Sequence, residues 1–224
     1  GIGYTGMSIR GSDGSRINVT INGVPLNDSE SHATYWVDLP DFASSISSIQ
    51  IQRGVGTSTN GAGAFGGSIN VSTQKQSQAS KFKLSNSFGS YGTLKNSISF
   101  TTGRVGNYFE LSGNLSKIYS GGYIDRASSN LKGYFLQGSY YKERTNIKFI
   151  AFGGHERTYQ AWYGLDQETL SNNRKFNYAG MYFNDDGDQF FYDKQEDNYK
   201  QDHYQLIFNH LINPSWRANL TFHY

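Results

Sequence analysis

One short segment gathers side chains that could bind a ligand. Residues 27–37 read NDSESHATYWV, and the candidates within them are His32, Tyr35 and Trp36. A histidine can ligate a metal or form hydrogen bonds, and the two aromatic rings can stack on a flat ligand. Tyr4, in the glycine-rich start of the chain, is a weaker candidate for the same site. Aromatic side chains also serve to pack a fold together, so both roles are open for this segment.

A second aromatic segment lies much later in the chain. Residues 155–164 read HERTYQAWYG, and Tyr159, Trp162 and Tyr163 within them could contact a ligand or close over it. Packing within a loop, or a place in an aromatic girdle at a membrane surface, would use the same residue types. The two segments therefore predict a binding function without naming the ligand.

Residues that could support catalysis form no recognisable arrangement. The five histidines are scattered, cysteine is absent, and no Ser–His–Asp pattern stands in a strand–turn–helix context. Residues 61–66 read GAGAFG, a GxGxxG pattern, but a β-like run follows where a dinucleotide-binding fold needs a helix. Asp185, Asp186 and Asp188 offer oxygens to calcium, yet the glutamate that completes an EF-hand loop is missing. We therefore expect no enzyme, no cofactor and no metal site, and a solvated acidic loop at 185–188.

The composition narrows the class of protein. Twenty Lys and Arg nearly balance 18 Asp and Glu, and no basic block indicates nucleic-acid binding. The lack of cysteine excludes disulfides and thiol chemistry, which suits a protein facing the periplasm. No run of about 18 apolar residues could form a transmembrane helix. Neither a starting methionine nor a signal peptide is present, so an exported protein would be a processed or partial chain.

Two regions of the chain differ in composition and in hydrophobic pattern. Residues 1–75 are rich in glycine, serine and threonine, whereas residues 76–224 hold most of the 17 Tyr and 15 Phe. In the first region, β-like runs are expected at 7–10, 16–21, 48–53 and 68–73, with one helical turn within 39–46. In the second region, alternating runs occur at 81–89, 93–102, 108–119, 131–142, 147–153, 198–210 and 218–224.

The alternating runs predict strands with two different faces. In the first of them, Phe82, Leu84 and Phe88 share one face while lysines and serines share the other. Runs of about ten residues can cross a bilayer at a tilt. Short connections alternate with long ones, apart from the tight first turn at 90–92, as in outer-membrane barrels. Because an open sheet in lipid leaves backbone groups unpaired, seven strands predict a partial chain.

Residues 8–73 resemble the plug domain of TonB-dependent receptors. The matching pieces stand in order: SIRGSDGSRINVTINGVPLND, then LP, then ISSIQIQRGVG, then NGAGAFGGSINVSTQ. The resemblance implies an all-β fold with minor helix in the plug. Residues 1–75 would be the later part of a plug, and residues 76–224 about seven N-terminal strands of a transmembrane antiparallel barrel. Such a barrel has about 22 strands when complete, and the plug lies in its lumen.

The resemblance also implies roles for individual residues. The 27–37 loop is similar to one at the outward apex of such plugs, where substrate is contacted. Arg10 and Arg53 each stand before a glycine, where such arginines pair with barrel carboxylates. Asn22 and Gly23 predict a tight turn because both accept positive φ. Gly66 and Gly67, with Gly61 and Gly63, would permit close backbone approach in the lumen.

The function implied by the resemblance is active uptake across the outer membrane of a Gram-negative bacterium. The substrate would be a scarce bulky nutrient, such as a ferric siderophore or a cobalamin-like molecule. Energy would come from the TonB–ExbB–ExbD complex, acting through a part of the protein outside this chain, and the other contact would be outer-membrane lipid. The alternatives are a soluble all-β carbohydrate- or ligand-binding module, an oligosaccharide uptake receptor of the same family, an enzyme using the glycine-rich loop, and a signalling receptor.

Overall fold

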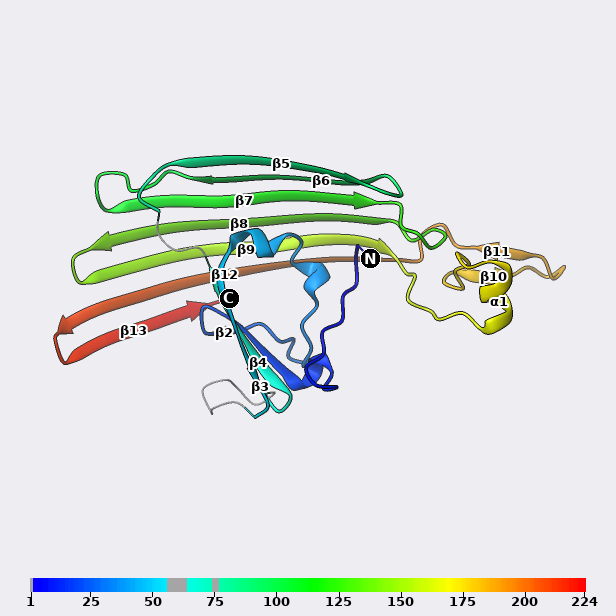
Figure 1. Ribbon diagram of the computed structural model, residues 1–224, viewed down its shortest axis with the longest axis horizontal. Coiled ribbons are helices and arrows are strands. Elements are labelled where there is room, and N and C mark those ends of the chain that lie inside the picture. Colours follow the sequence, from blue (N-terminus) through cyan, green and yellow to red (C-terminus); the bar gives the residue numbers. More distant parts are fainter. Residues whose placement is uncertain (1, 56–63, 74–76) are drawn as a thin grey trace.

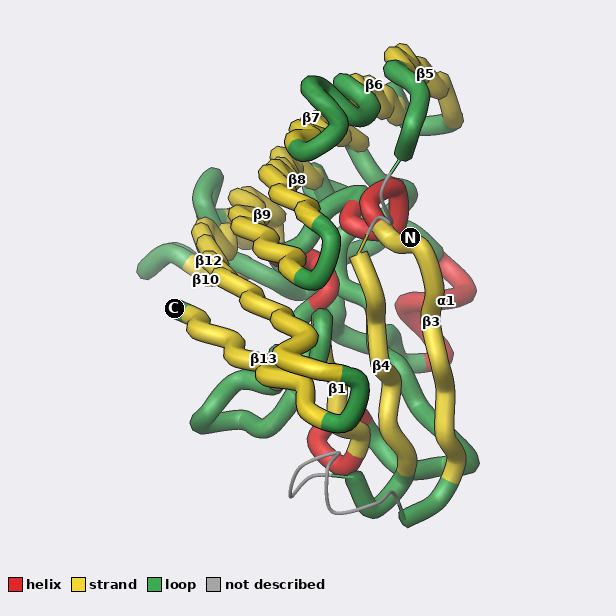
Figure 2. The backbone as a smooth tube through the Cα atoms, turned by 90° about the vertical axis from the view of Figure 1, so that its left-hand side faces the viewer, coloured by secondary structure: helices red, strands yellow, loops and turns green. Residues whose placement is uncertain are grey.

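The computed structural model describes residues 2–55, 64–73 and 77–224. Its strands form a four-stranded sheet, a seven-stranded sheet and a small two-stranded hairpin. Figure 1 shows the seven long strands stacked side by side, with the four-stranded sheet against one of their faces. Figure 2 looks along the long strands and shows that their sheet is curved, with the smaller sheet on its concave side. No helix in the described residues is long and apolar enough to cross a membrane.

The four-stranded sheet is mixed and has the order β2-β1-β4-β3. Its strands are β1 (Ile17–Ile21), β2 (Val24–Pro25), β3 (Ile46–Arg53) and β4 (Gly67–Thr73). The 3-10 helix η1 (Gly14–Arg16) precedes β1, and the 3-10 helices η2 (Trp36–Asp38) and η3 (Phe42–Ser45) lie between β2 and β3 along the chain. β1 is buried along its whole length because it pairs with β2 on one side and, in parallel, with β4 on the other.

The seven-stranded sheet, which we call the wall, is antiparallel throughout and has the order β13-β12-β9-β8-β7-β6-β5. Its strands are β5 (Lys81–Gly89), β6 (Thr93–Thr101), β7 (Phe109–Ser120), β8 (Ser129–Lys142), β9 (Thr145–Tyr159), β12 (Glu196–Asn213) and β13 (Trp216–His223). Backbone hydrogen bonds between Tyr204 and Tyr224 continue the last ladder by one pair. The seven strands predicted from the alternation are therefore confirmed.

The connections differ sharply in length between the two ends of the wall. At one end two residues link β8 to β9, and two link β12 to β13. At the other end, residues 160–195 form a long excursion with α1 (Gln167–Asn172), β10 (Met181–Phe183) and β11 (Gln189–Phe191) (Figure 1). We call this the long-loop end. The β10–β11 turn carries Asp185, Asp186 and Asp188, which are exposed, and the Asn184 side chain accepts hydrogen bonds from the backbone of Asp186 and Asp188.

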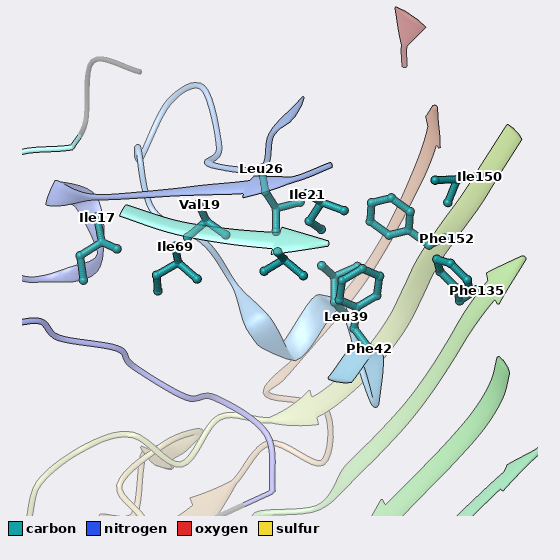
Figure 3. Close-up of a cluster of buried hydrophobic side chains, with 11 residues drawn as sticks. Ile17, Val19, Ile21, Leu26, Leu39, Phe42, Ile69, Phe135, Ile150 and Phe152 are labelled. Carbon is teal, nitrogen blue, oxygen red and sulfur yellow. The ribbon is translucent and has the colours of Figure 1, made fainter. Parts of the chain in front are cut away.

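The two faces of the wall have opposite character. The outward face carries exposed aromatic and aliphatic side chains, including Phe82, Phe88 and Leu115. The inward face is largely polar, and its most deeply buried apolar side chains are Phe135 of β8 and Ile150 and Phe152 of β9. These three side chains are completely or almost completely buried, since they meet apolar side chains of the smaller sheet. Figure 3 shows this shared core, whose other members are Ile17, Val19, Ile21, Leu26, Leu39, Phe42, Ile69 and Val71.

One of the expected β-like runs is wrong. Residues 7–10 form no strand, because Arg10 and Gly11 both take positive φ and turn the chain between Ile9 and Ser12. The backbone groups of Ile9 and Ser12 pair across that turn at 3.0 and 3.1 Å. Two residues with left-handed backbone cannot continue an extended strand, so the short apolar pattern gave the wrong local structure.

Candidate functional site

A pair of glycines seats the smaller sheet on the wall. Gly133 of β8 and Gly154 of β9 are cross-strand partners. A Cβ on Gly133 would lie 2.2 Å from the Pro40 carbonyl oxygen, and one on Gly154 would lie 2.2 Å from the Asp38 carbonyl oxygen. The neighbouring Ser116 donates a hydrogen bond to the same Pro40 oxygen at 3.3 Å. Only glycine allows the backbone of residues 38–40 to approach the two strands this closely.

Amide side chains form a second contact between the two sheets. Asn22 donates through Nδ2 to Gln205 Oε1 at 3.1 Å, and Gln205 donates through Nε2 to the Ile21 carbonyl at 3.2 Å. Nearby, Thr73 Oγ1 donates to Gln137 Oε1 at 3.1 Å. Gln137 and Gln205 are buried, so these bonds satisfy polar groups that have little access to water. The smaller sheet is thus fixed to β8, β9 and β12 by both packing and hydrogen bonds.

A cavity of about 670 Å³ lies at the long-loop end, between the smaller sheet and the wall. Its lining comes from the 27–37 segment, the start of the chain, the ends of β9 and β12, and the long loop. The lining residues are Tyr4, Leu26, Asp28, Ala33, Thr34, Tyr35, Asp38, Leu39, Glu156, Gln160, Trp162, Asp197, Asn198, Tyr199 and Gln201. Small-molecule sites in proteins have volumes of roughly 300–1,000 Å³, so the cavity can hold a bulky ligand.

Four carboxylates give the cavity its charge: Asp28, Asp38, Glu156 and Asp197. Asp38 and Glu156 are 5% and 3% exposed and lie within hydrogen-bonding reach of each other, where they can share a proton. Burial, followed by the neighbouring Glu156 carboxylate, raises the pKa of Asp38 to about 7. Hydrogen bonds from the backbone and side chain of Ser31 lower the pKa of Asp28 and keep it ionised.

Three of the seven predicted ligand contacts meet in this cavity. Tyr4, Tyr35 and Trp162 line it, although they come from three distant parts of the sequence. The Tyr4 hydroxyl donates a hydrogen bond to Asp197 Oδ2, which joins the start of the chain to β12. Tyr4 and Trp162 also line a second cavity of about 640 Å³ beside the first, so they stand between the two. Their role in ligand binding stays a prediction.

The other four predicted ligand contacts do not line this cavity. Trp36 packs against the shared core, and Tyr159 is buried with its hydroxyl donating to the Tyr192 carbonyl at 2.7 Å. Tyr159 also lines the second cavity. Tyr163 is exposed and stacks on Trp162 with ring centroids 4.5 Å apart. His32 is exposed with positive φ in the 27–37 segment, and neither it nor Trp36 nor Tyr163 is among the described residues lining these two cavities.

Of the residues predicted to hold the smaller sheet in place, some contact the wall and others are exposed. Asn22 and Gly23 have positive φ and connect β1 to β2, and Asn22 makes the contact with Gln205 described above. Arg10 and Arg53 are exposed, and neither pairs with a carboxylate in the described ranges, so their pairing stays a prediction.

The glycine-rich segment packs tightly where the structure describes it. A Cβ on Gly66 would lie 2.4 Å from Ser12 Cβ, and one on Gly67 would lie 2.7 Å from the Gln52 carbonyl oxygen. Both positions therefore need glycine for close approach rather than for an unusual φ. Gly61 and Gly63, predicted for the same purpose, lie outside the described residues.

Several residues of the site were not predicted from the sequence. Gly133, Gly154 and Gln205 stand on inward positions of strands whose alternation was recognised, but nothing marked them as contacts. The available signal was the apolar inward face of β8 and β9, where Phe135 and Phe152 break the expected polar pattern. For Asp38 and Glu156 the sequence offers no signal, because 118 residues separate them and only folding brings them together.

Comparisons with known proteins agree with this architecture. Residues 1–68 match the family model of the TonB-dependent Receptor Plug Domain. The ferric-catecholate import receptor Fiu from E. coli K12 is 16% identical, with a TM-score of 0.72 over 97% of this chain and 32% of that one. The ferric yersiniabactin uptake receptor FyuA from Yersinia pestis is 14% identical, with a TM-score of 0.71 over 100% and 34%. The copper transporter OprC is 14% identical, with a TM-score of 0.70 over 99% and 33%.

The chain thus spans about a third of the length of the solved receptors that it resembles. No curated protein has a matching sequence. The seven-stranded wall is open at β5 and β13, and it corresponds to the first strands of the receptors' barrels. The family match identifies residues 1–68 as plug-domain sequence, and the fold of the whole chain is that of a plug followed by the first barrel strands of TonB-dependent receptors.

Proposed function

We propose that the intact receptor containing this chain takes up a bulky metal chelate across the outer membrane of a Gram-negative bacterium. The family match and the uptake functions named for Fiu and FyuA support this proposal. Energy comes from the TonB–ExbB–ExbD complex, acting on a part of the protein outside this chain. Among the predicted substrates, a ferric siderophore has the support of those two receptors, whereas the cobalamin-like alternative gains none from the structures named above.

The shared cavity at the long-loop end is the observation that carries the proposal. Its lining combines Asp38 of the plug with Glu156 of the wall and Trp162 of the long loop. A ligand held there touches the plug and the barrel at the same time. Binding can therefore favour one arrangement of plug and wall over another, as transport requires. A transporter also needs the long-loop end to face outward, as long loops do in outer-membrane barrels.

The outward face of the wall fits contact with lipid. Exposed Phe82, Leu84 and Phe88 on β5, together with Leu115 on β7, would be unfavourable in water but not against acyl chains. We place the boundary between plug and barrel at about residue 75, since β4 ends at Thr73 and β5 begins at Lys81. This division keeps each sheet within one part of the chain.

An uptake experiment tests the proposal. Cells that lack the receptor gene are complemented with the intact receptor and grown under iron limitation, with and without a functional TonB gene. We expect accumulation of radiolabelled ferric hydroxamate to depend on both genes. Accumulation that is equal with and without the receptor would rule out this function for the hydroxamates, and accumulation independent of TonB would rule out the energy source.

A further inference from the structure

We propose that the cavity lined by Asp28, Asp38, Glu156 and Asp197 selects a positively charged substrate: a metal chelate bearing a free ammonium group. This inference rests on the proposed function and specifies the class of substrate. It predicts discrimination against polyanionic chelates of similar size. Three independent features of the cavity support it: its charge, its aromatic side chains and an unpaired buried oxygen.

The charge of the lining has one sign. Four carboxylates line the cavity, and among the residues that the structure describes no lysine or arginine does. A polyanion placed there would meet uncompensated repulsion in a partly desolvated space, whereas a cation would be attracted. The cavity therefore discriminates by charge before any specific contact forms.

Cationic side chains on the adjoining strand ends are engaged elsewhere. Arg157 pairs with Glu196 at 2.7 Å, and Lys200 pairs with Asp202 at 2.9 Å. Because side chains alternate along a strand, Arg157 and Lys200 point to the face opposite Glu156 and Gln201, which line the cavity. These two cations cannot neutralise the cavity without a change of strand register.

The aromatic side chains suit an ammonium group. Tyr4, Tyr35, Trp162 and Tyr199 line the cavity, and each is between 44% and 61% exposed, so their rings are accessible. An ammonium group is attracted to the face of an aromatic ring, and most strongly to that of tryptophan. A set of rings interleaved with carboxylates is the combination that recognises organic cations in proteins. The rings also give room for the apolar body of a chelate.

Asp38 adds a buried acceptor without a donor. Its side chain is nine-tenths or more buried and lines the cavity, and Oδ1 accepts no hydrogen bond from the described residues. An unsatisfied buried carboxyl oxygen is costly, and its neighbour Glu156 is another acid that cannot compensate it while both are ionised. A cationic ligand would supply the missing donor and the missing charge together.

A charge-matched pair of ligands tests the proposal on the intact receptor in detergent. The probes are a linear ferric trihydroxamate with a free primary amine, the same complex with that amine acetylated, and an anionic ferric triscatecholate. Dissociation constants come from calorimetric titration, with quenching of tryptophan fluorescence as a second readout. We expect the amine-bearing complex to bind about tenfold more tightly than the acetylated one, as one cation–π or charge contact would give.

Carboxylate variants locate the selectivity. Asp197→Asn should reduce the tenfold preference to about twofold, since it removes one attractive charge without changing size. Glu156→Gln should reduce it less, since Asp38 then carries the charge that the two acids share. Asp185→Asn, in the exposed β10–β11 turn, is the matched control and should leave the preference unchanged. Because Glu156 is buried, the less buried Asp197 keeps the test valid if Glu156→Gln fails to fold.

The outcomes separate this proposal from the uptake function. Equal binding of the two hydroxamates, tighter binding of the triscatecholate, no binding of the amine-bearing complex, or a preference that survives both carboxylate variants would overturn it. The titration needs no energy source, so its failure would leave TonB-dependent uptake to be judged by the cellular experiment. A failed uptake experiment with a positive titration would leave the cation-selective cavity in place.

Discussion

Two parts of the wall differ in how they contact the plug: one packs closely against it, and the other leaves a cavity. The contact wall, formed by β8, β9 and β12, presents Phe135, Phe152 and the Gly133–Gly154 pair to it. The open wall, formed by β5 and β6, presents lysine and serine on its inward face and leaves a cavity of about 470 Å³. The lysines and serines lining that cavity are Ser44, Ser47, Ser77, Lys81, Lys83, Ser85, Ser87, Lys95, Ser97 and Ser99.

The two parts of the wall differ because their inward side chains gain different amounts of free energy when they leave water and contact the plug. Apolar side chains and glycine gain from close contact, so the contact wall holds the plug through packing and buried amide hydrogen bonds. Lysine and serine remain hydrated at little cost, so the open wall gains less from a close fit. A plug attached on one side and hydrated on the other can be displaced locally without breaking its whole interface. The contact wall should therefore dominate the free energy that holds the plug.

The largest effect is expected from filling the space at the glycine pair. Gly133→Ala places a Cβ 2.2 Å from the Pro40 carbonyl oxygen, and a backbone atom cannot give way as a flexible side chain can. We expect the free energy of plug unfolding to fall by about 3 kcal/mol, at the upper end for overpacked sites. Chemical denaturation of the intact receptor measures this, and faster hydrogen exchange near Leu39 and Ser116 would localise it.

The matched control lies on the same strand. Gly138 is on the outward face of β8, and a Cβ there would meet nothing within 4 Å. Gly138→Ala should change the free energy of unfolding by less than about 0.5 kcal/mol. If both variants lose the same stability, the cost comes from β8 itself and the contact wall has no special hold on the plug.

A smaller effect is expected from the amide contact. Gln205→Ala removes the partner of Asn22 Nδ2 and of the Ile21 carbonyl, and leaves both groups with less hydrogen bonding. We expect a loss of about 2 kcal/mol, typical of an unsatisfied buried polar group. Asn22→Ala and the double variant complete a cycle, in which a coupling energy of roughly 1 kcal/mol would assign the effect to the pair. Purely additive losses would show that the two amides act separately.

The strands of the wall could be predicted from the sequence, but their contacts with the plug could not. Period-2 alternation fixes which side chains share a face, so the outward set of Phe82, Leu84 and Phe88 could be predicted without tertiary information. The plug contact depends on which inward positions meet another sheet, and alternation carries no such information. Phe135 and Phe152 did hint at it, because a polar lumen gives no reason for aromatic side chains on the inward face.

The candidate site shows the same limit more clearly. Aromatic residue types pointed to Tyr4, Tyr35 and Trp162, which do line one cavity, and equally to Trp36 and Tyr159, which pack inside the fold. Residue type alone cannot separate these cases, because stacking on a ligand and packing in a core use the same apolar ring. The separation depends on the exposure of each ring.

The smallest effect is expected where the open wall does touch the plug. Lys95 of β6 donates to Asp41 Oδ1 at 2.5 Å, with side-chain exposures of 36% and 3%. Lys95→Met leaves the Asp41 carboxylate buried, but Ser44 still donates to the same oxygen at 2.7 Å, so the loss should be about 1 kcal/mol. Lys83→Met on the same inward face is the control and should be nearly neutral, and Asp41→Asn should recover part of the loss in the Lys95→Met background. Chemical denaturation of these variants measures the loss in the free energy of unfolding. A larger loss for Lys95→Met than for Gly133→Ala would contradict the comparison between the two walls, because the plug would then be held chiefly by one ion pair to β6.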